Sequence, residues 1–122
     1  MPISVTGWPV VHMVFHGCIS QSEFLAWQEQ TTALLDKAEP FVVVTQSLEP
    51  IELPEKYRQT EAGWHKQNKP KFAAHCLAIA RVASTPAQFE RLNLPGMKKL
   101  WPCEYLATMD LDEALTWAAK HL

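Results

Sequence analysis

The chain has 122 residues, of which 48% are hydrophobic and 20% are charged, and its formal net charge is −2. This length suits one domain over residues 1–122, and the near-neutral charge excludes the broad basic surface of a nucleic-acid-binding protein. Three cysteines without a Cys-x-x-Cys pair argue against a disulfide framework. No signal-peptide pattern opens the chain, and no apolar run approaches the ~20 residues that span a bilayer. We therefore expect a cytoplasmic protein.

Two strands and a helix are predicted at the start of the chain. Residues 2–8 have the composition of an edge strand. Residues Val10–His16 are rich in β-branched and aromatic side chains, which favours a central strand that ends at Gly17. A helix is predicted over Gln21–Ala38, where apolar side chains recur at helical spacing, and Pro40 stops it.

Three segments have the sequence of a capping box, in which the cap residue and the third helical residue bond each other's backbone amides. They are Ser20–Glu23, Thr85–Gln88 and Asp110–Glu113. The first is extended by Ile19 and Phe24, which are placed to form a hydrophobic staple. We therefore expect helices to begin just after residues 20, 85 and 110.

The middle of the chain predicts a buried strand and an interrupted helix. Residues Phe41–Thr45 form a continuous apolar run, which is typical of a strand that is buried on both faces. Residues 46–53 are predicted to be a loop. A second helix is expected from about Pro54, and Pro70 is expected to break or kink it.

The last third of the chain completes a strand–helix alternation. Residues Cys76–Ala83 are the third core strand, residues 94–96 interrupt the third helix, and Glu104–Thr108 are the last strand. An amphipathic helix follows Asp110. This order predicts an α/β fold, with a single mostly parallel sheet of about five strands, an antiparallel edge strand and about four helices.

Sequence motifs for catalysis are weak. The scattered glycines form no phosphate-binding loop. His12 and His16 point to the same face of a strand but lie about 13 Å apart, which is too far to share a metal. Cys18 precedes a helix amino terminus, a position that can favour a thiolate. We expect a non-enzymatic protein without cofactor or metal, and a small enzyme that uses Cys18 or a histidine is an alternative.

Large apolar side chains lie on the segments around the two helix interruptions. These segments are expected to cover the carboxyl edge of the sheet, where α/β folds bind ligands. Large aromatics with few polar groups suit a lipid-like ligand, although the same residues also suit a plain core. The candidates for contact with an apolar ligand or a membrane are Tyr57, Trp64, Phe72, Met97, Leu100 and Trp101.

Lysines accompany these apolar residues. Lys66 and Lys69 lie in the second predicted helix, and Lys98 and Lys99 precede Trp101. A solvated helix face is one interpretation, and contact with an anionic surface, such as the inner face of a membrane, is the other. The size of the chain and its spare tryptophans also lead us to expect a homodimer.

Several apolar motifs together resemble a known family. They are Gly17-x-Ile19-x-x-x-x-Phe24, Phe41–Val44, Ala62-x-Trp64, Ala78-Ile-Ala-x-Val82 and Asp112-Glu-Ala-Leu-x-Trp117. From about Val10, the chain resembles the SpoIIAA-like branch of the STAS superfamily, whose α/β domains are related in architecture to the lipid-binding CRAL-TRIO domains. The resemblance implies a bacterial, non-enzymatic protein that binds a protein partner, a membrane surface or an apolar ligand.

The chain departs from this family at one position. Anti-sigma-factor antagonists of the superfamily carry Asp-Ser-(Ser/Thr/Gly) after the strand that matches Phe41–Thr45, and a partner kinase phosphorylates the hydroxyl there. Here Thr45-Gln-Ser47 replaces that motif, with Ser47 near the modified position. A regulatory protein with a phospho-switch at Ser47 is therefore an alternative function.

Overall fold

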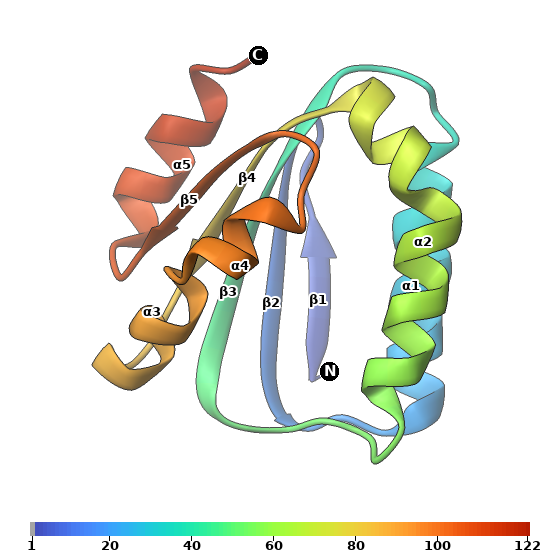
Figure 1. Cartoon of the computed structure of the whole chain (residues 1–122), viewed down its shortest axis with the longest axis vertical. Coiled ribbons are helices and arrows are strands. Elements are labelled where there is room, and N and C mark those ends of the chain that lie inside the picture. Colours follow the sequence, from blue (N-terminus) through green and yellow to red (C-terminus); the bar gives the residue numbers. More distant parts are fainter. Residues whose placement is uncertain (1) are drawn as a thin grey trace.

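A five-stranded sheet lies at the centre of the computed structural model, which describes residues 2–122 (Figure 1). Its strands follow the chain order across the sheet: β1 (Ile3–Thr6), β2 (Val10–Cys18), β3 (Phe41–Glu52), β4 (Cys76–Val82) and β5 (Glu104–Thr108). The edge strand β1 pairs with β2 in antiparallel orientation, and the other neighbours are parallel. The predicted α/β class, the five strands and the antiparallel edge are confirmed.

Helices cover both faces of this sheet (Figure 1). They are α1 (Gln21–Leu35), α2 (Tyr57–His75), α3 (Pro86–Leu92), α4 (Pro95–Lys99) and α5 (Leu111–Ala119). The long helices α1 and α2 lie side by side on one face, and α5 lies on the other. The expected interruption at residues 94–96 divides two short helices, α3 and α4, so the described chain has one helix more than we predicted.

The core divides into two layers because successive strand residues face opposite sides of the sheet. On one side, Val43 and Ile79 pack in a cluster with Phe72 of α2. On the other side, β3 and β4 contribute small and branched residues that pack against the alanines of α5: Val42, Val44, Ala78, Ala80, Ala114 and Ala118. These small side chains let α5 lie close to the sheet, whereas larger side chains separate the sheet from α1 and α2.

The start of α1 agrees with the predicted capping box and staple. The Glu23 amide donates to Ser20 Oγ at 3.2 Å, and the Ser20 amide donates back to Glu23 Oε1 at 3.0 Å. Ile19 and Phe24 pack in one buried cluster. These local contacts fix where α1 begins, and the helix ends at Leu35, three residues before the predicted end.

Only half of each of the other two predicted capping boxes forms. The Gln88 amide donates to Thr85 Oγ1 at 3.2 Å, but the Gln88 side chain accepts from the Ser84 amide at 2.7 Å instead of the cap residue's amide. The Glu113 amide donates to Asp110 Oδ1 at 3.2 Å without a reciprocal bond among the hydrogen bonds of the described chain. Both helices nevertheless begin where the sequence predicts.

The predicted loop at residues 46–53 is wrong, because β3 continues to Glu52. The reason is pairing with β2, which itself runs past Gly17 to Cys18. Phe15 pairs with Ser47, and after a register shift Cys18 pairs with Glu52. This backbone ladder outweighs the local turn preference of the segment.

Of the break or kink predicted at Pro70, the break does not occur, since α2 runs from Tyr57 to His75 as one helix with Pro70 inside it. Pro70 is exposed, so its ring projects into solvent. Trp64 and Phe72, which precede and follow it, both pack in the cluster beneath the helix. Tertiary packing therefore holds the helix together across a residue that removes one of its hydrogen bonds.

Candidate functional site

A cavity of about 150 Å³ lies between the sheet and helices α1 and α2. Residues from β2, β3, β4, α1, α2 and the segment after α4 line it. Its wall is largely apolar and includes the aromatic residues Phe15, Phe24, Trp27, Trp64, Phe72 and Trp101. Concave sites with apolar walls and few polar groups are typical of small-molecule binding sites.

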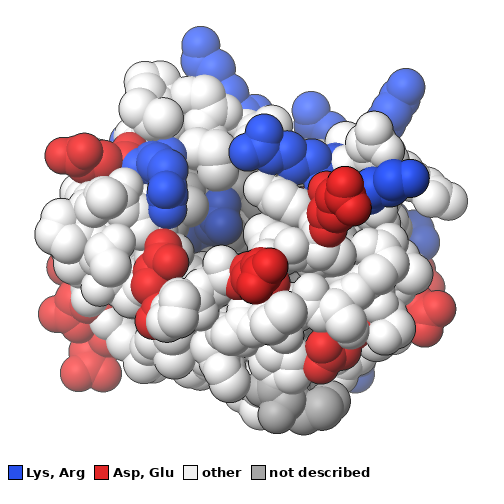
Figure 2. All heavy atoms as spheres, turned by 90° about the horizontal axis from the view of Figure 1, so that it is seen from below, with Lys and Arg blue, Asp and Glu red and all other residues white. Residues whose placement is uncertain are grey.

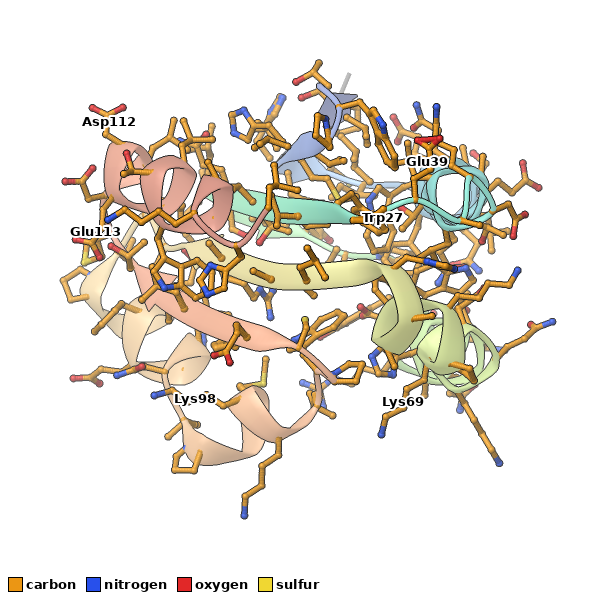
Figure 3. The ribbon with its side chains drawn as sticks, turned by 90° about the horizontal axis from the view of Figure 1, so that it is seen from above. Trp27, Glu39, Lys69, Lys98, Asp112 and Glu113 are labelled. Carbon is orange, nitrogen blue, oxygen red and sulfur yellow. The ribbon has the colours of Figure 1, made fainter. Side chains whose placement is uncertain are left out.

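The aromatic rings around the cavity contact one another in sequence. The ring centroids of Trp27 and Trp64 are 5.8 Å apart, and those of Trp64 and Phe72 are 5.7 Å apart. Trp101 continues the series, with its ring 5.7 Å from Phe72. Figure 3 shows Trp27 projecting from α1 toward the sheet. Edge-to-face and tilted pairs at these distances stabilise a fixed wall.

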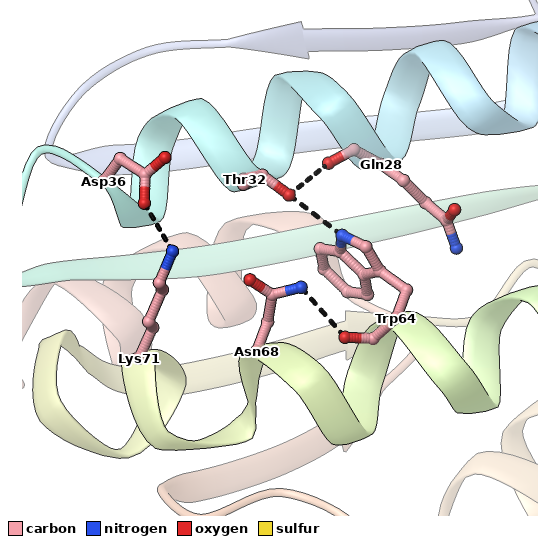
Figure 4. Close-up of polar contacts among 6 residues, drawn as sticks. All are labelled: Gln28, Thr32, Asp36, Trp64, Asn68 and Lys71. Carbon is pink, nitrogen blue, oxygen red and sulfur yellow. Dashed lines mark hydrogen bonds and ion pairs between the residues drawn. The ribbon is translucent and has the colours of Figure 1, made fainter.

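One hydrogen bond between α1 and α2, supported by one bond within each helix, fixes the position of Trp64 (Figure 4). Its Nε1 donates to Thr32 Oγ1 at 2.9 Å, and Thr32 donates to the carbonyl of Gln28 at 2.9 Å. Asn68 Nδ2 donates to the carbonyl of Trp64 at 2.9 Å. The indole of Trp64 therefore joins the two helices and forms part of the cavity wall at the same time.

Polar groups enter the cavity from β3, β4 and α2. Thr45 and Ser47 lie on β3, Arg81 on β4 and Glu61 on α2. Thr45 and Arg81 are paired in the register of the parallel strands, so their side chains lie side by side on one face. Figure 2 shows the molecule from the carboxyl ends of β2–β4, with a basic side chain recessed in a hollow. Among the described residues that line the cavity, Arg81 is the only lysine or arginine.

Burial shapes the electrostatics of these polar groups. Burial raises the pKa of the Glu61 carboxyl, and the positive charge of Arg81 partly opposes the shift. Burial also raises the pKa of Tyr105, which Arg81 again opposes. In the part of the chain that the structure describes, no carboxylate comes within ion-pair distance of Arg81. The guanidinium is thus near a buried carboxyl without being paired to it.

Two buried polar atoms of the cavity residues lack a hydrogen-bond partner. They are Thr45 Oγ1 and Trp101 Nε1. A buried polar group without a partner costs about 1–3 kcal/mol of stability. Such atoms in a cavity wall are available to a bound molecule, because a ligand can supply the missing partner.

The structure brings some of the predicted contact residues together and separates others. Trp64, Phe72 and Trp101 line the cavity. Tyr57 packs against Phe24 instead, at a ring distance of 6.3 Å, and Met97 packs against the small cluster beside β5. Leu100 is about half exposed, at 49%.

The other sequence-based candidates lie at the surface or on the strands. Lys66 and Lys69 on α2 and Lys98 and Lys99 on α4 are exposed, and Figure 3 shows Lys69 and Lys98 on the side of the molecule away from β1. Ser47 is half-buried and lines the cavity within β3.

The residues of the alternative enzyme hypothesis also have clear positions. Cys18 is exposed at the end of β2 and is not a cavity residue. His12 Nε2 lies 3.2 Å from Gln46 Oε1, on the sheet face opposite the cavity. These positions do not bring Cys18 and His12 together as one site.

Sequence reasoning did not select Thr45, Arg81 or Glu61 as a group. A signal was present for two of them, because Val43, Thr45 and Ser47 alternate along β3 and Ile79 and Arg81 along β4. One charged residue in an otherwise apolar strand marks a polar position on the covered face. Glu61 had no comparable signal, since the inward face of α2 depends on its packing.

Residues 2–122 form neither an evident metal site nor a helix that could span a membrane. No group of three or more His, Cys, Asp or Glu side chains is arranged to hold a metal ion. None of the helices formed by these residues combines the length and the apolar character needed to cross a membrane.

Comparison with known proteins identifies the architecture. No family model matches the sequence, and no curated protein matches it. A solved structure of an uncharacterized DUF3478-family protein with a SpoIIAA-like fold, from Shewanella loihica PV-4, does match. The TM-score is 0.62 at 16% identity, over 95% of this chain and 91% of that one. The protein has a SpoIIAA-like fold.

A second solved structure agrees with this SpoIIAA-like fold. It is an anti-sigma factor antagonist from Mycobacterium paratuberculosis, with a TM-score of 0.54 and 19% identity. The match covers 96% of this chain and 92% of that one. The SpoIIAA-like fold that the sequence resemblance implies is therefore confirmed.

Proposed function

We propose that this SpoIIAA-like protein is a non-enzymatic module that binds a small, largely apolar ligand in the cavity beneath α1 and α2. The observation that carries the proposal is the aromatic wall of Trp27, Trp64 and Trp101 around a cavity with few polar groups. A ligand in the cavity removes apolar surface from contact with water. This burial favours binding by about 25 cal/mol per Å² of apolar surface.

The volume of the cavity limits the size of this ligand. A dry apolar cavity of about 150 Å³ is large enough to bind benzene, and the cavity described here has about that volume. The proposed ligand therefore has a body close to one aromatic ring or a short branched chain. A long fatty acyl chain would fit only in part, which narrows the lipid-like ligand expected from the sequence.

The proposal is tested by blocking the cavity. Saturation-transfer NMR with 2-phenylethanol, a neutral single-ring probe, should give saturable binding to the unaltered protein. Ser47→Leu places a larger side chain at the cavity wall and should abolish the signal. Gln46→Leu is the matched control, because the neighbouring residue faces the other side of β3 and is not a cavity residue.

Two outcomes would count against ligand binding. One is the absence of saturable binding to a folded protein at millimolar probe. The other is equal loss of binding in Ser47→Leu and Gln46→Leu, which would separate the probe's site from the cavity.

Contact with an anionic membrane surface is a second candidate. It is favoured by the exposed lysines on α2 and α4, Lys66, Lys69, Lys98 and Lys99. Each lysine that lies near an anionic membrane contributes about 1 kcal/mol to the binding free energy of a polybasic surface. Co-sedimentation with vesicles that contain anionic lipid, but not with zwitterionic vesicles, is the expected result. If equal amounts of the protein sedimented with both vesicle types, this candidate would be rejected.

A regulatory role with a protein partner is a third candidate, favoured by the likeness to the anti-sigma factor antagonist. Ser47 lies within β3 and lines the cavity, so phosphorylation there would add charge to a largely apolar site. Intact mass of protein from native cells tests this modification. Light scattering of the same sample tests the proposed homodimer.

A further inference from the structure

We infer that the ligand is a small monocarboxylate whose apolar body fills the aromatic cavity and whose carboxylate binds Arg81 and Thr45. This inference rests on the proposed function and names the chemical class of its ligand. It assigns the polar end of the cavity as the specificity-determining part of the site.

The strand register provides the first argument. Thr45 on β3 and Arg81 on β4 are paired in parallel strands, which lie about 4.8 Å apart. Both residues line the cavity, so a hydroxyl and a guanidinium lie next to each other at its wall. One carboxylate has two oxygens, which match two neighbouring donors of this kind.

Unused hydrogen-bonding capacity provides the second argument. Thr45 Oγ1 is buried without a partner, and Arg81, which interacts with the Tyr105 side chain, has no described carboxylate within ion-pair distance. Trp101 Nε1, a donor on another cavity residue, is also buried without a partner. Guanidinium and indole N–H groups only donate hydrogen bonds, so Arg81 and Trp101 each need acceptors. A ligand with acceptor oxygens supplies them.

The charge balance of the cavity favours a carboxylate over a phosphate. Arg81 supplies one positive charge, and Glu61 adds a carboxyl group to the same cavity. A dianionic phosphate would leave uncompensated negative charge in a site that excludes most water. A planar monocarboxylate matches one guanidinium in both charge and shape.

The Glu61 charge should affect carboxylate binding in the direction opposite to that of Arg81. An ionised Glu61 competes with the ligand for the positive charge of Arg81 and repels a bound carboxylate. Removal of the Glu61 charge should therefore tighten carboxylate binding, whereas removal of Arg81 should weaken it. A merely structural role would make both substitutions act in the same direction.

The test compares three probes that share one aromatic ring, by isothermal titration calorimetry at pH 7.5. Phenylacetate should bind more tightly than 2-phenylethanol, by about tenfold, because a charge-assisted hydrogen bond is gained. Phenyl phosphate should bind more weakly than phenylacetate. Circular dichroism of each variant below confirms that it is folded before titration.

Three variants then locate the carboxylate. Arg81→Met should remove the advantage of phenylacetate over 2-phenylethanol. Glu61→Gln should tighten phenylacetate binding relative to that of 2-phenylethanol. Arg91→Met is the matched control, because Arg91 is an exposed cation on α3 next to Glu49 at 3.5 Å and lies outside the cavity residues.

The outcomes separate this inference from the proposed function. If 2-phenylethanol binds and phenylacetate gains nothing from Arg81, the inference is overturned and ligand binding in the cavity stands. Tighter binding of phenyl phosphate than of phenylacetate would also overturn it. If none of the probes binds the folded protein, the proposed function fails together with the inference.

Discussion

Thr45 on β3 and Arg81 on β4 are register partners in adjacent parallel strands, and both face the cavity beneath α1 and α2. This pairing places a hydroxyl and a positive charge at one position of a largely apolar wall. Thr45 Oγ1 is buried there without a hydrogen-bond partner. The free protein therefore retains a polar group whose burial is not compensated.

The first prediction concerns this unpartnered hydroxyl. Thr45→Val keeps the shape of the side chain and removes the buried oxygen, so the free energy of unfolding should rise by about 1 kcal/mol. Thr108→Val is the control, because Thr108 Oγ1 accepts from the Asp110 amide at 3.1 Å and its loss should destabilise the protein. Urea denaturation measures both. Equal destabilisation would contradict an unpartnered Thr45.

The second prediction concerns the link between α1 and α2. Trp64→Phe removes the donor to Thr32 and part of a large buried ring, so the free energy of unfolding should fall by about 1–3 kcal/mol. Asp36→Asn breaks only the exposed ion pair with Lys71 and should cost less than about 1 kcal/mol. If the two substitutions had equal effects in urea denaturation, Trp64 would not be the main tie between the helices.

The third prediction concerns the proline within α2. Pro70 is exposed and lies inside a continuous helix, so Pro70→Ala should raise the free energy of unfolding by about 1–3 kcal/mol. Gly63→Ala in the same helix is the comparison, with an expected gain of about 0.5–1 kcal/mol, because an added Cβ there meets open space. If Pro70→Ala left the midpoint of thermal unfolding unchanged, this would indicate a helix that ends at Pro70.

The fourth prediction is a pH dependence of stability. Burial lowers the pKa of His65 below its usual 6.5, and Lys69 adds to this shift. The unfolded chain then binds more protons than the folded one, so stability should fall as pH drops through 6.5 toward the lowered pKa. Glu61 acts with opposite sign, because burial raises its pKa above 4.5 and its contribution to stability should rise as pH drops from that raised pKa toward 4.5.

The measurement for His65 is a comparison of two proteins. Urea unfolding of the unaltered protein and of His65→Phe is followed from pH 5 to 8, and groups that both proteins share cancel in the difference. The difference should change between neutral pH and the lowered pKa of His65. A difference that is flat across this range would show that the folded protein tolerates a protonated His65.

The fifth prediction compares the reactivity of the Cys18 and Cys76 thiols. Cys18 is exposed, Cys103 is half-buried and Cys76 is buried. A hydrogen bond with Cys103, together with burial, raises the pKa of Cys76 far above its usual value, so this thiol should resist alkylation. Peptide mapping after brief iodoacetamide treatment should show modification of Cys18 before Cys76. Early modification of Cys76 would show that the buried start of β4 opens readily.

Much of the fold was predictable because its signals are local. The cap at Ser20 and the proline at position 86 mark where helices begin, and alternation of apolar strands with helices favours a parallel sheet. The extent of β3 was not predictable in this way. Residues 46–52 are held by pairing with β2, a strand more than thirty residues away in the sequence.

The site was only partly predictable for the same reason. Trp64, Phe72 and Trp101 stand out as large aromatics on segments expected above the sheet, and all three line the cavity. The pairing of Thr45 with Arg81 depends on the register between two strands, which no local pattern specifies. Polar specificity residues on neighbouring strands are thus harder to find from one sequence than an aromatic wall.

The most direct test of ligand binding in the cavity uses the five tryptophans of the chain. Trp27, Trp64 and Trp101 line the cavity, whereas Trp8 and Trp117 do not. In ¹H–¹⁵N NMR spectra recorded during a titration with 2-phenylethanol, the indole signals of the first three should shift together and saturate. The other two should stay in place. Equal shifts of all five signals, or no saturable shift in any, would contradict binding in the cavity.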